Sequence, residues 1–510
     1  MDFLKRTFPI LFGIFLLSVA VRWPQLNRPL SNHHEFCTAI SLRIMQAWYD
    51  EGISRFEYNP AMNYGHSTDK HINNHANQTG GLIDENGNYY YVSHPPFAYY
   101  FPYFIFKLLH IRPDVMPIRI FNLALHFISG LFVYFIVCLL SFSRARAMPY
   151  RSAIVAFAIY IFLPVTMWFQ GNVYMSDMAV HTVFVIGVYT VLKMIIRQKF
   201  YSYKYIFFYV VSLSLMLYTS WLGVFFAAGV LIYSLLHVQQ IKGFKVLIAA
   251  TVLCLIAISQ IVIYQYSQIH GPMNFFSEMI SRYMVRGSFA DTKHGLLHFM
   301  FGYLWFAKTL LYNYVLHYNV FFLLLIGFIY VAATHKKLKI VFSENGYRFI
   351  WLSVAPVVML HVLFLNYSVH DFTTLYASLF FSVLFGILYD KLKKSGSISL
   401  RKMQVSLVVV LLLLVAQFHV YNQGTDYYLN AGKLIAENAT TNEVIFTNQQ
   451  MLMEPQVIFY AQRNVRFAED TADAKLFLKR TKQQNGVFIT THSRAGGVVI
   501  QSKTPVSAEP

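Results

Sequence analysis

The chain has little charge and few cysteines. Only 13% of its 510 residues are Asp, Glu, Lys or Arg, about half the share in an average soluble protein. Its three cysteines, Cys37, Cys138 and Cys254, lie far apart and show neither a disulfide framework nor a zinc-binding spacing. We find no internal repeat and no low-complexity linker. These absences argue against a disulfide-stapled secreted domain, a zinc module and a repeat array.

Apolar residues are abundant instead. The chain is 56% hydrophobic and 17% aromatic, and apolar runs of nearly 20 residues recur from end to end, which is typical of transmembrane helices. We therefore predict a polytopic α-helical membrane protein. The eleven predicted spans are 4–21, 117–141, 152–169, 176–196, 205–220, 222–237, 245–266, 304–333, 349–366, 371–390 and 403–420.

The net charge of the chain is +18, and its basic residues lie mostly in short loops between the predicted spans. Lysine and arginine concentrate in alternate loops, which predicts a cytoplasmic side and an N-terminus on that side. Nucleic acid is therefore not an expected partner. The segments 22–116, 267–303 and 421–510 fall on the extracytoplasmic side. We interpret residues 1–21 as an uncleaved anchor, because Val21-Arg22-Trp23-Pro24 is a poor signal-peptide cleavage site.

Two extracytoplasmic segments have structure of their own. Within 22–116, the apolar residues of 39–48 have helical spacing and predict an interfacial helix. The aromatic stretch 97–109 predicts a second interfacial helix or a shallow re-entrant one. The tail 421–510 alternates strand patterns (443–447, 487–491, 498–502) with helical ones (453–462, 472–484), which predicts a small α/β domain without a nucleotide-binding loop.

Two acidic residues stand just outside predicted spans. Glu35 follows the first span, where a carboxylate can act as a general base, although a solvated loop glutamate has the same sequence appearance. Asp177 precedes the fourth span and either caps that helix or takes part in chemistry. His181 lies one helical turn later, so the pair is also a weak candidate for a divalent cation.

Basic and imidazole side chains cluster on the same side. His94 precedes Pro95-Pro96, Arg282 and Arg286 lie in the aromatic loop 267–303, and His370 enters a late span. Arginine is well shaped to bind phosphate. A rigid turn at His94 or His370, or contact of the loop with lipid headgroups, explains each feature equally well.

The order of these features resembles the GT-C superfamily of integral-membrane glycosyltransferases. An anchor helix is followed by Arg28-Pro29-Leu30, then His34-Glu35, an interfacial helix, Pro95-Pro96-Phe97, Arg119 at the start of a span, and Asp177. The pattern is most similar to protein mannosyltransferases and the aminoarabinose transferases of lipid A. The resemblance covers roughly residues 1–390 and is best over 22–180.

The resemblance implies sugar transfer from a polyprenyl- or dolichyl-phosphate donor on the extracytoplasmic side, usually with inversion. The acceptor is a lipid, a glycan or a protein. By matching motifs, Glu35 and Asp177 take the catalytic positions, although His34 stands where the family usually has its first acid. The residues expected to contact substrate or phosphate are His34, His94, Arg119, Arg282, Arg286 and His370. The cofactor is unknown, with a divalent cation at Asp177 and His181 as one option.

Two other functions compete with transfer. A transporter or flippase of lipid-linked sugars would place charged residues at the bilayer midplane, whereas the ionisable cluster here lies at one surface. A non-catalytic membrane assembly protein would use the tail domain for binding. The substitution of His34 for the usual acid is compatible with that alternative.

Overall fold

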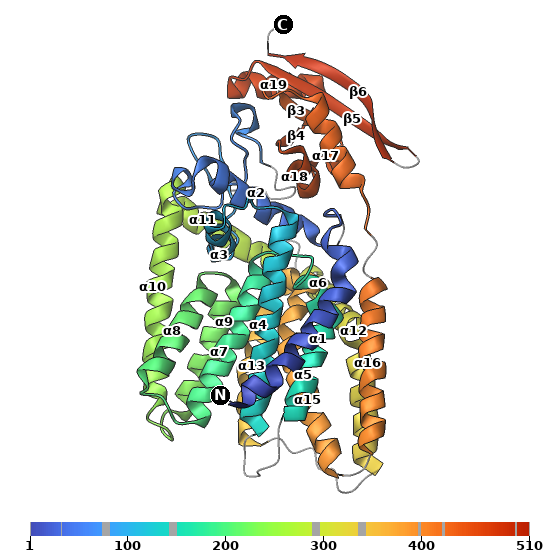
Figure 1. Cartoon of the computed structure of the whole chain (residues 1–510). Coiled ribbons are helices and arrows are strands. Elements are labelled where there is room, and N and C mark those ends of the chain that lie inside the picture. Colours follow the sequence, from blue (N-terminus) through green and yellow to red (C-terminus); the bar gives the residue numbers. More distant parts are fainter. Residues whose placement is uncertain are drawn as a thin grey trace.

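The computed structural model describes the chain apart from ten short segments. Residues 1, 32, 74–81, 142–149, 288–295, 335–342, 396–398, 421–423, 495–496 and 509–510 lie outside the described residues. The predicted loop 267–303 is therefore described only in part. Figure 1 shows three levels: a long helical bundle, a layer of loops and short helices on one end of it, and a C-terminal α/β unit above that layer.

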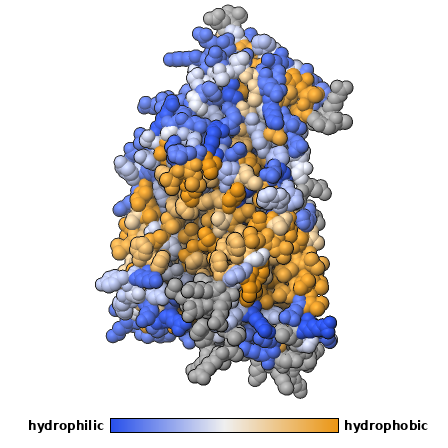
Figure 2. Space-filling view, viewed as in Figure 1, coloured by the Kyte–Doolittle hydropathy of each residue, from blue (hydrophilic) through white to orange (hydrophobic). Residues whose placement is uncertain are grey.

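The bundle is built from long apolar helices. They are α1 (Asp2–Leu26), α4 (Val115–Ser141), α5 (Tyr150–Phe162), α6 (Pro164–Phe169), α7 (Ser176–Ile196), α8 (Tyr203–Leu217), α9 (Trp221–His237), α10 (Phe244–His270), α12 (Leu296–Thr334), α13 (Glu344–Leu363), α15 (Ser378–Ser395) and α16 (Leu400–Val420). Among the described residues, eight helices are long and apolar enough to cross a membrane, and three apolar helices are shorter. Figure 2 shows an apolar belt across the visible face of the bundle, with more polar surfaces above and below it.

Each of the eleven predicted spans contains a helix, but four of them are interrupted. The predicted span 304–333 is kinked at Tyr318, and the predicted span 349–366 breaks at Phe364, after α13. The predicted span 152–169 divides into α5 and α6 at Leu163, which has extended backbone angles because a proline follows it. The predicted span 371–390 begins as the 3₁₀ segment η4 (Asp371–Ala377) before α15. The short helix α14 (Leu365–Ser368) connects α13 to η4. These breaks bring backbone and polar side chains of α6, α14 and η4 to one end of the bundle.

The layer above the bundle contains α2 (Glu35–Glu51), α3 (Phe97–Leu108) and α11 (Pro272–Arg286), with the short elements η1 (Ile53–Phe56), η2 (Ser67–Asp69), β1 (Leu82–Ile83) and β2 (Tyr89–Tyr90). The sequence predicts α2 as an interfacial helix, yet residues 37–48 of it are all buried. Its polar side chains find partners there: Ser41 donates to Tyr174 O at 3.0 Å and Gln46 to Pro113 O at 2.9 Å. Helix α2 is therefore a core element between the bundle and the C-terminal unit.

The C-terminal unit has the predicted α/β composition. Its elements are α17 (Tyr427–Asn438), β3 (Val444–Thr447), η5 (Gln450–Met453), α18 (Pro455–Ala461), β4 (Val465–Phe467), α19 (Thr471–Thr481), β5 (Asn485–Arg494) and β6 (Gly497–Ser507). The sheet order is β4-β3-β5-β6, with β3 parallel to β4 and β5, and β6 antiparallel to β5. Helix α18 faces downward and packs against α2.

Candidate functional site

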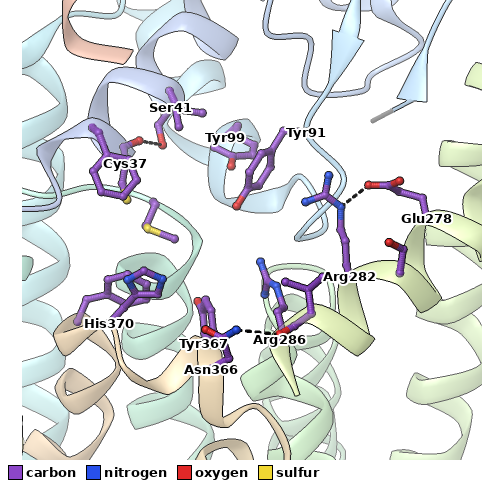
Figure 3. Close-up of a pocket in the computed structure, with 16 residues that line it drawn as sticks. Cys37, Ser41, Tyr91, Tyr99, Glu278, Arg282, Arg286, Asn366, Tyr367 and His370 are labelled. Carbon is purple, nitrogen blue, oxygen red and sulfur yellow. Dashed lines mark hydrogen bonds and ion pairs between the residues drawn. The ribbon is translucent and has the colours of Figure 1, made fainter. Parts of the chain in front are cut away.

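A pocket of about 270 Å³ lies where the layer meets the bundle. Helices α2, α3 and α11, the start of α7 and the α14–η4 connection all contribute to it. Its lining consists of Phe36, Cys37, Ile40, Ser41, Tyr91, Tyr99, Met175, Glu278, Ser281, Arg282, Val285, Arg286, Asn366, Tyr367, His370 and Phe372. Figure 3 shows Arg282 and Arg286 on one side of this space and Cys37 and His370 on the other. Three of the predicted phosphate-binding residues therefore share one cavity.

The two arginines differ in how they are paired. Arg282 Nε lies 2.7 Å from Glu278 Oε1, and its Nη1 donates to Ser93 Oγ at 2.5 Å. The guanidinium of Arg286 lies over the Tyr367 ring at 4.6 Å, and its Nη1 is buried without a hydrogen-bond partner. No carboxylate among the described residues forms an ion pair with Arg286. A positive group in that state favours an anionic ligand.

Asp177 is held just behind the pocket. It is fully buried at the first turn of α7, and its Oδ1 accepts hydrogen bonds from the hydroxyls of Tyr367 and Tyr376. Ser176 donates to its other oxygen at 3.3 Å. Because Tyr367 lines the pocket and carries Arg286 on its ring face, Asp177 fixes the position of that ring. The structure thus places Asp177 one side chain away from the cavity.

His94 also lies behind the lining. It is 1% exposed, and neither ring nitrogen has a hydrogen-bond partner among the described residues. Burial lowers its pKa well below the usual value, and the positive charges of Arg286 and Arg282 lower it further. His94 is therefore neutral near pH 7. Any phosphate contact that it makes is a hydrogen bond from a neutral ring and not an ion pair.

Glu35 sits in a different environment from the pocket. It is fully buried at the start of α2, and its Oε1 accepts from Arg28 Nη2 and Arg119 Nη2, each at 2.9 Å. Its Oε2 accepts from the backbone N–H of Ser31 at 2.8 Å. Arg119 also donates to the carbonyls of Gln25, Leu26 and Arg28. Glu35 and Arg119 do not line the pocket, and their contacts tie the first loop to α4.

His34 neighbours the pocket and contacts a carboxylate that the sequence analysis did not single out. Its Nε2 lies 2.8 Å from Asp371 Oδ1, at the start of η4. His33 Nε2 and His317 Nε2 lie 2.9 and 3.0 Å from Asp371 Oδ2. The signal available in the sequence was an acid at the start of a span, on the same predicted side as the histidines. That signal does not identify partners more than 300 residues away.

His370 lines the pocket directly, as expected for a residue that contacts substrate. Desolvation by the surrounding protein and repulsion from His34 lower its pKa to about 4, so that the ring is neutral near pH 7. Its ring stacks on Phe372, with centroids 5.3 Å apart. His370 can therefore offer a neutral hydrogen bond to a ligand.

Asp177 and His181 have different hydrogen-bond partners. His181 Nε2 contacts the hydroxyls of Tyr160 at 2.9 Å and Ser378 at 3.4 Å, whereas Asp177 contacts Tyr367 and Tyr376. In the part of the chain that the structure describes, no group of three or more His, Cys, Asp or Glu side chains is arranged to hold a metal ion. The two residues have separate hydrogen-bonding roles in this arrangement.

Comparisons with known proteins were made by sequence and by structure. No family model and no curated protein matches the sequence. Solved structures that share the fold include the following two. The archaeal oligosaccharyltransferase AglB from Archaeoglobus fulgidus, in complex with an inhibitory peptide and a dolichol-phosphate, has a TM-score of 0.54 at 10% identity, covering 95% of this chain and 70% of that one. ArnT from Cupriavidus metallidurans, bound to undecaprenyl phosphate, has a TM-score of 0.56 at 12% identity, covering 96% and 93%.

Proposed function

We propose, on the premise of the GT-C fold that the chain shares with AglB and ArnT, that it transfers a sugar from a polyprenyl-phosphate donor to an extracytoplasmic acceptor. The two solved structures contain dolichol-phosphate and undecaprenyl phosphate, so a lipid phosphate is a natural ligand for this fold. The pocket then lies on the extracytoplasmic side, in agreement with the charge distribution of the loops.

The observation that carries the proposal is the state of Arg286. Its guanidinium lines the cavity, stacks on Tyr367 and lacks a carboxylate partner among the described residues. A donor phosphate would supply the missing negative charge, and Arg282 lies on the same helix one turn earlier. Since the leaving group is a phosphate, charge stabilisation helps its departure more than proton donation does. The two arginines supply that stabilisation.

A lipid tail has a route to the pocket. A second, apolar cavity of about 360 Å³ lies between α8, α9, α10 and α11, and Ser93 contributes to its lining. Ser93 accepts a hydrogen bond from Arg282, which lines the first pocket. The phosphate site and the apolar cavity therefore meet at this contact. A polyprenyl chain in the second cavity would leave its phosphate beside Arg282.

The roles of the two acids differ from the sequence-based expectation. We assign Glu35 to holding the first loop, because both of its oxygens are occupied by Arg28, Arg119 and Ser31. We assign Asp177 to positioning Tyr367 beneath Arg286. His370 lines the pocket as a neutral group, and the neutral His94 ring lies behind the lining, 6.0 Å from the Tyr367 ring between centroids.

The experiment is sugar transfer by the purified protein in liposomes, from a panel of radiolabelled polyprenyl-phosphate sugars. Arg286→Gln is expected to lower kcat/KM for the donor by about 10- to 150-fold, the range for losing one hydrogen bond to a charged group. Arg55→Gln is the matched control, because Arg55 is an exposed, ion-paired arginine in the same layer. Equal activity of the two variants would contradict the assignment of Arg286. Movement of labelled lipid across the bilayer without transfer would favour a flippase.

A further inference from the structure

The Asp371 carboxylate contacts three imidazole rings that come from two distant parts of the chain. His33 and His34 come from the loop before α2, and His317 comes from α12. The Asp371 side chain is 7% exposed, compared with 26% for His33, 18% for His34 and 1% for His317. A carboxylate buried this far is stable only with such partners. The proposed function leaves this cluster without a role.

The contacts define the state of the His34 ring. His34 Nε2 lies 2.8 Å from Asp371 Oδ1, within ion-pair distance, so the negative charge of the carboxylate favours the proton on Nε2 of the neutral ring. The lone pair is then on Nδ1. That nitrogen is buried and has no hydrogen-bond partner among the described residues. His34 therefore combines a neighbouring carboxylate with an unoccupied proton acceptor, which is the arrangement of a histidine base held by an acid.

The backbone that presents the two histidines is unusual. His33 and His34 have φ angles of 48° and 66°, in the left-handed region that residues other than glycine rarely adopt. His34 holds this conformation at the N-cap position of α2, yet its side chain makes no capping hydrogen bond. Conformations of this kind persist where the surrounding structure fixes them, often at functional sites. Here the turn directs both rings to Asp371.

The neighbours of the two rings separate their roles. The His34 ring lies 5.6 Å from Phe36, 5.5 Å from His370 and 5.2 Å from Phe372, between ring centroids. All three of these residues line the pocket. Phe169, which does not line the pocket, contacts both rings, whereas Trp168, which also does not line it, is a neighbour of the His33 ring. Of these two histidines on Asp371, only His34 adjoins the cavity wall.

We propose that His34 and Asp371 form the dyad that accepts a proton in the site, and this inference rests on the proposed function. The acceptor hydroxyl gives its proton to His34 Nδ1 as its oxygen forms a bond to the anomeric carbon of the donor sugar. The bond between that carbon and the phosphate oxygen breaks, and the lipid phosphate leaves with the electron pair. Asp371 stabilises the resulting imidazolium. The dyad replaces the carboxylate base for which Glu35 is the expected candidate, since Glu35 is fully hydrogen-bonded.

Other charged and titratable groups surround the dyad and bear on its pH dependence. They are His33 and Glu35 in the same segment, His370 beside Asp371, His317 on α12, and Arg286 on α11. Glu35 has its charge balanced by Arg28 and Arg119. Asp371 is thus the nearest negative partner of the His34 ring among the described residues.

The test is the single-turnover transfer rate at saturating donor, measured against pH in liposomes. His34→Gln is expected to lower the rate by about 10²- to 10⁴-fold, the usual contribution of a general base, with little change in donor KM. In this variant, the rise of the transfer rate with pH on the acidic side of the profile should also disappear. Asp371→Asn should lower the rate and move that limb to lower pH, because the imidazolium loses its negative partner.

His33→Gln is the matched control, since it removes another imidazole from Asp371 at a position away from the cavity wall. Its rate is expected within about threefold of the unsubstituted protein. Two results would overturn the dyad while leaving sugar transfer established. One is transfer by His34→Gln at the rate of the His33→Gln control. The other is loss of the transfer activity of His34→Gln on addition of a chelator. Absence of transfer by the unsubstituted protein overturns both proposals. Thermal unfolding of Asp371→Asn checks that a lost rate is not lost folding.

Discussion

Glu35 shows how a buried charge is stabilised at the entrance to the bundle. Its carboxylate neutralises two arginines and accepts a backbone N–H from Ser31. Such a group contributes to stability through its partners, because each of them would otherwise be a buried charge without compensation. At this scale, burial and hydrogen-bond saturation distinguish a positioning residue from a reactive one.

Glu35→Gln should therefore destabilise the protein as well as reduce transfer. Removing one partner of a buried ion pair costs about 3–5 kcal/mol, and here Arg28 and Arg119 both lose their counter-charge. We expect a clear fall in the melting temperature measured in detergent, with partial recovery of transfer at lower temperature. A variant with unchanged melting temperature and no transfer would instead identify Glu35 as the base.

His94 predicts a pH-dependent stability. Burial and the nearby Arg286 and Arg282 keep its folded-state pKa well below that of an unfolded histidine, which is about 6.5. Below that pH the unfolded chain binds a proton that the folded one does not, so the contribution to stability is present above about pH 6.5 and is lost as pH falls. Between pH 7.5 and 5, the melting temperature of His94→Asn should fall less than that of the unsubstituted protein. Parallel melting curves in both proteins would count against this assignment.

Helix α18 links the C-terminal unit to the loop that carries His34 and Glu35. The backbone N–H of Leu30 donates to Tyr460 Oη at 2.6 Å, and Gln456 Nε2 donates to Ser31 O at 2.9 Å. Helix α18 itself packs on α2. These contacts brace the loop from above, while Arg119 braces it from below. The loop that carries His34 and Glu35 is thus held by an element that is distant in sequence.

Tyr460→Phe tests the bracing by α18. It removes one hydrogen bond, worth about 0.5–1.5 kcal/mol, and leaves Leu30 N–H without its partner. We expect a small loss of stability and a several-fold lower transfer rate, with donor KM nearly unchanged. Tyr428→Phe is a suitable control, because Tyr428 lies on α17 and packs within the C-terminal unit. The same rate in both variants would show that the contact does not influence the site.

On the scale of the whole molecule, one buried ion pair connects the C-terminal unit to the layer below it. Arg463 Nε lies 3.1 Å from Asp69 Oδ2, and Asn464 N donates to Asp69 Oδ1 at 2.9 Å. Both members of the pair are buried. Arg463 also binds the carbonyls of Thr440 and Glu443. The C-terminal unit is therefore fixed to the segment between α2 and α3 and not merely tethered to α16.

Arg463→Met should loosen this junction. It leaves the buried Asp69 carboxylate without its charged partner, at a cost of about 3–5 kcal/mol. We expect faster proteolysis of the C-terminal unit and a lower melting temperature. Arg466→Met is the control, because Arg466 lies two residues beyond Asn464 and stacks on Phe477 within the same unit. Equal protease sensitivity of the two variants would show that Asp69 and Arg463 do not hold the junction.

Much of this architecture was predictable from local patterns. Hydrophobic runs identified the helices, because each span must satisfy its own backbone in a membrane. Strand and helix periodicity identified the α/β tail, and Arg282, Arg286 and His370, which the sequence predicts to contact phosphate, lie around one cavity. The breaks at Leu163 and before η4, and the burial of α2, were not predicted. They depend on packing against segments that are far away in the chain.

The sequence by itself determined the class of protein, the approximate helices and the residue types available for chemistry, since these follow from composition, periodicity and local motifs. Tertiary structure alone decided what each ionisable group does. It surrounded Glu35 with arginines, left Arg286 without a carboxylate among the described residues, and brought Asp371 to His34. The reason is physical: the state of a charge is set by its desolvation and its nearest partners, and those partners come from distant parts of the chain.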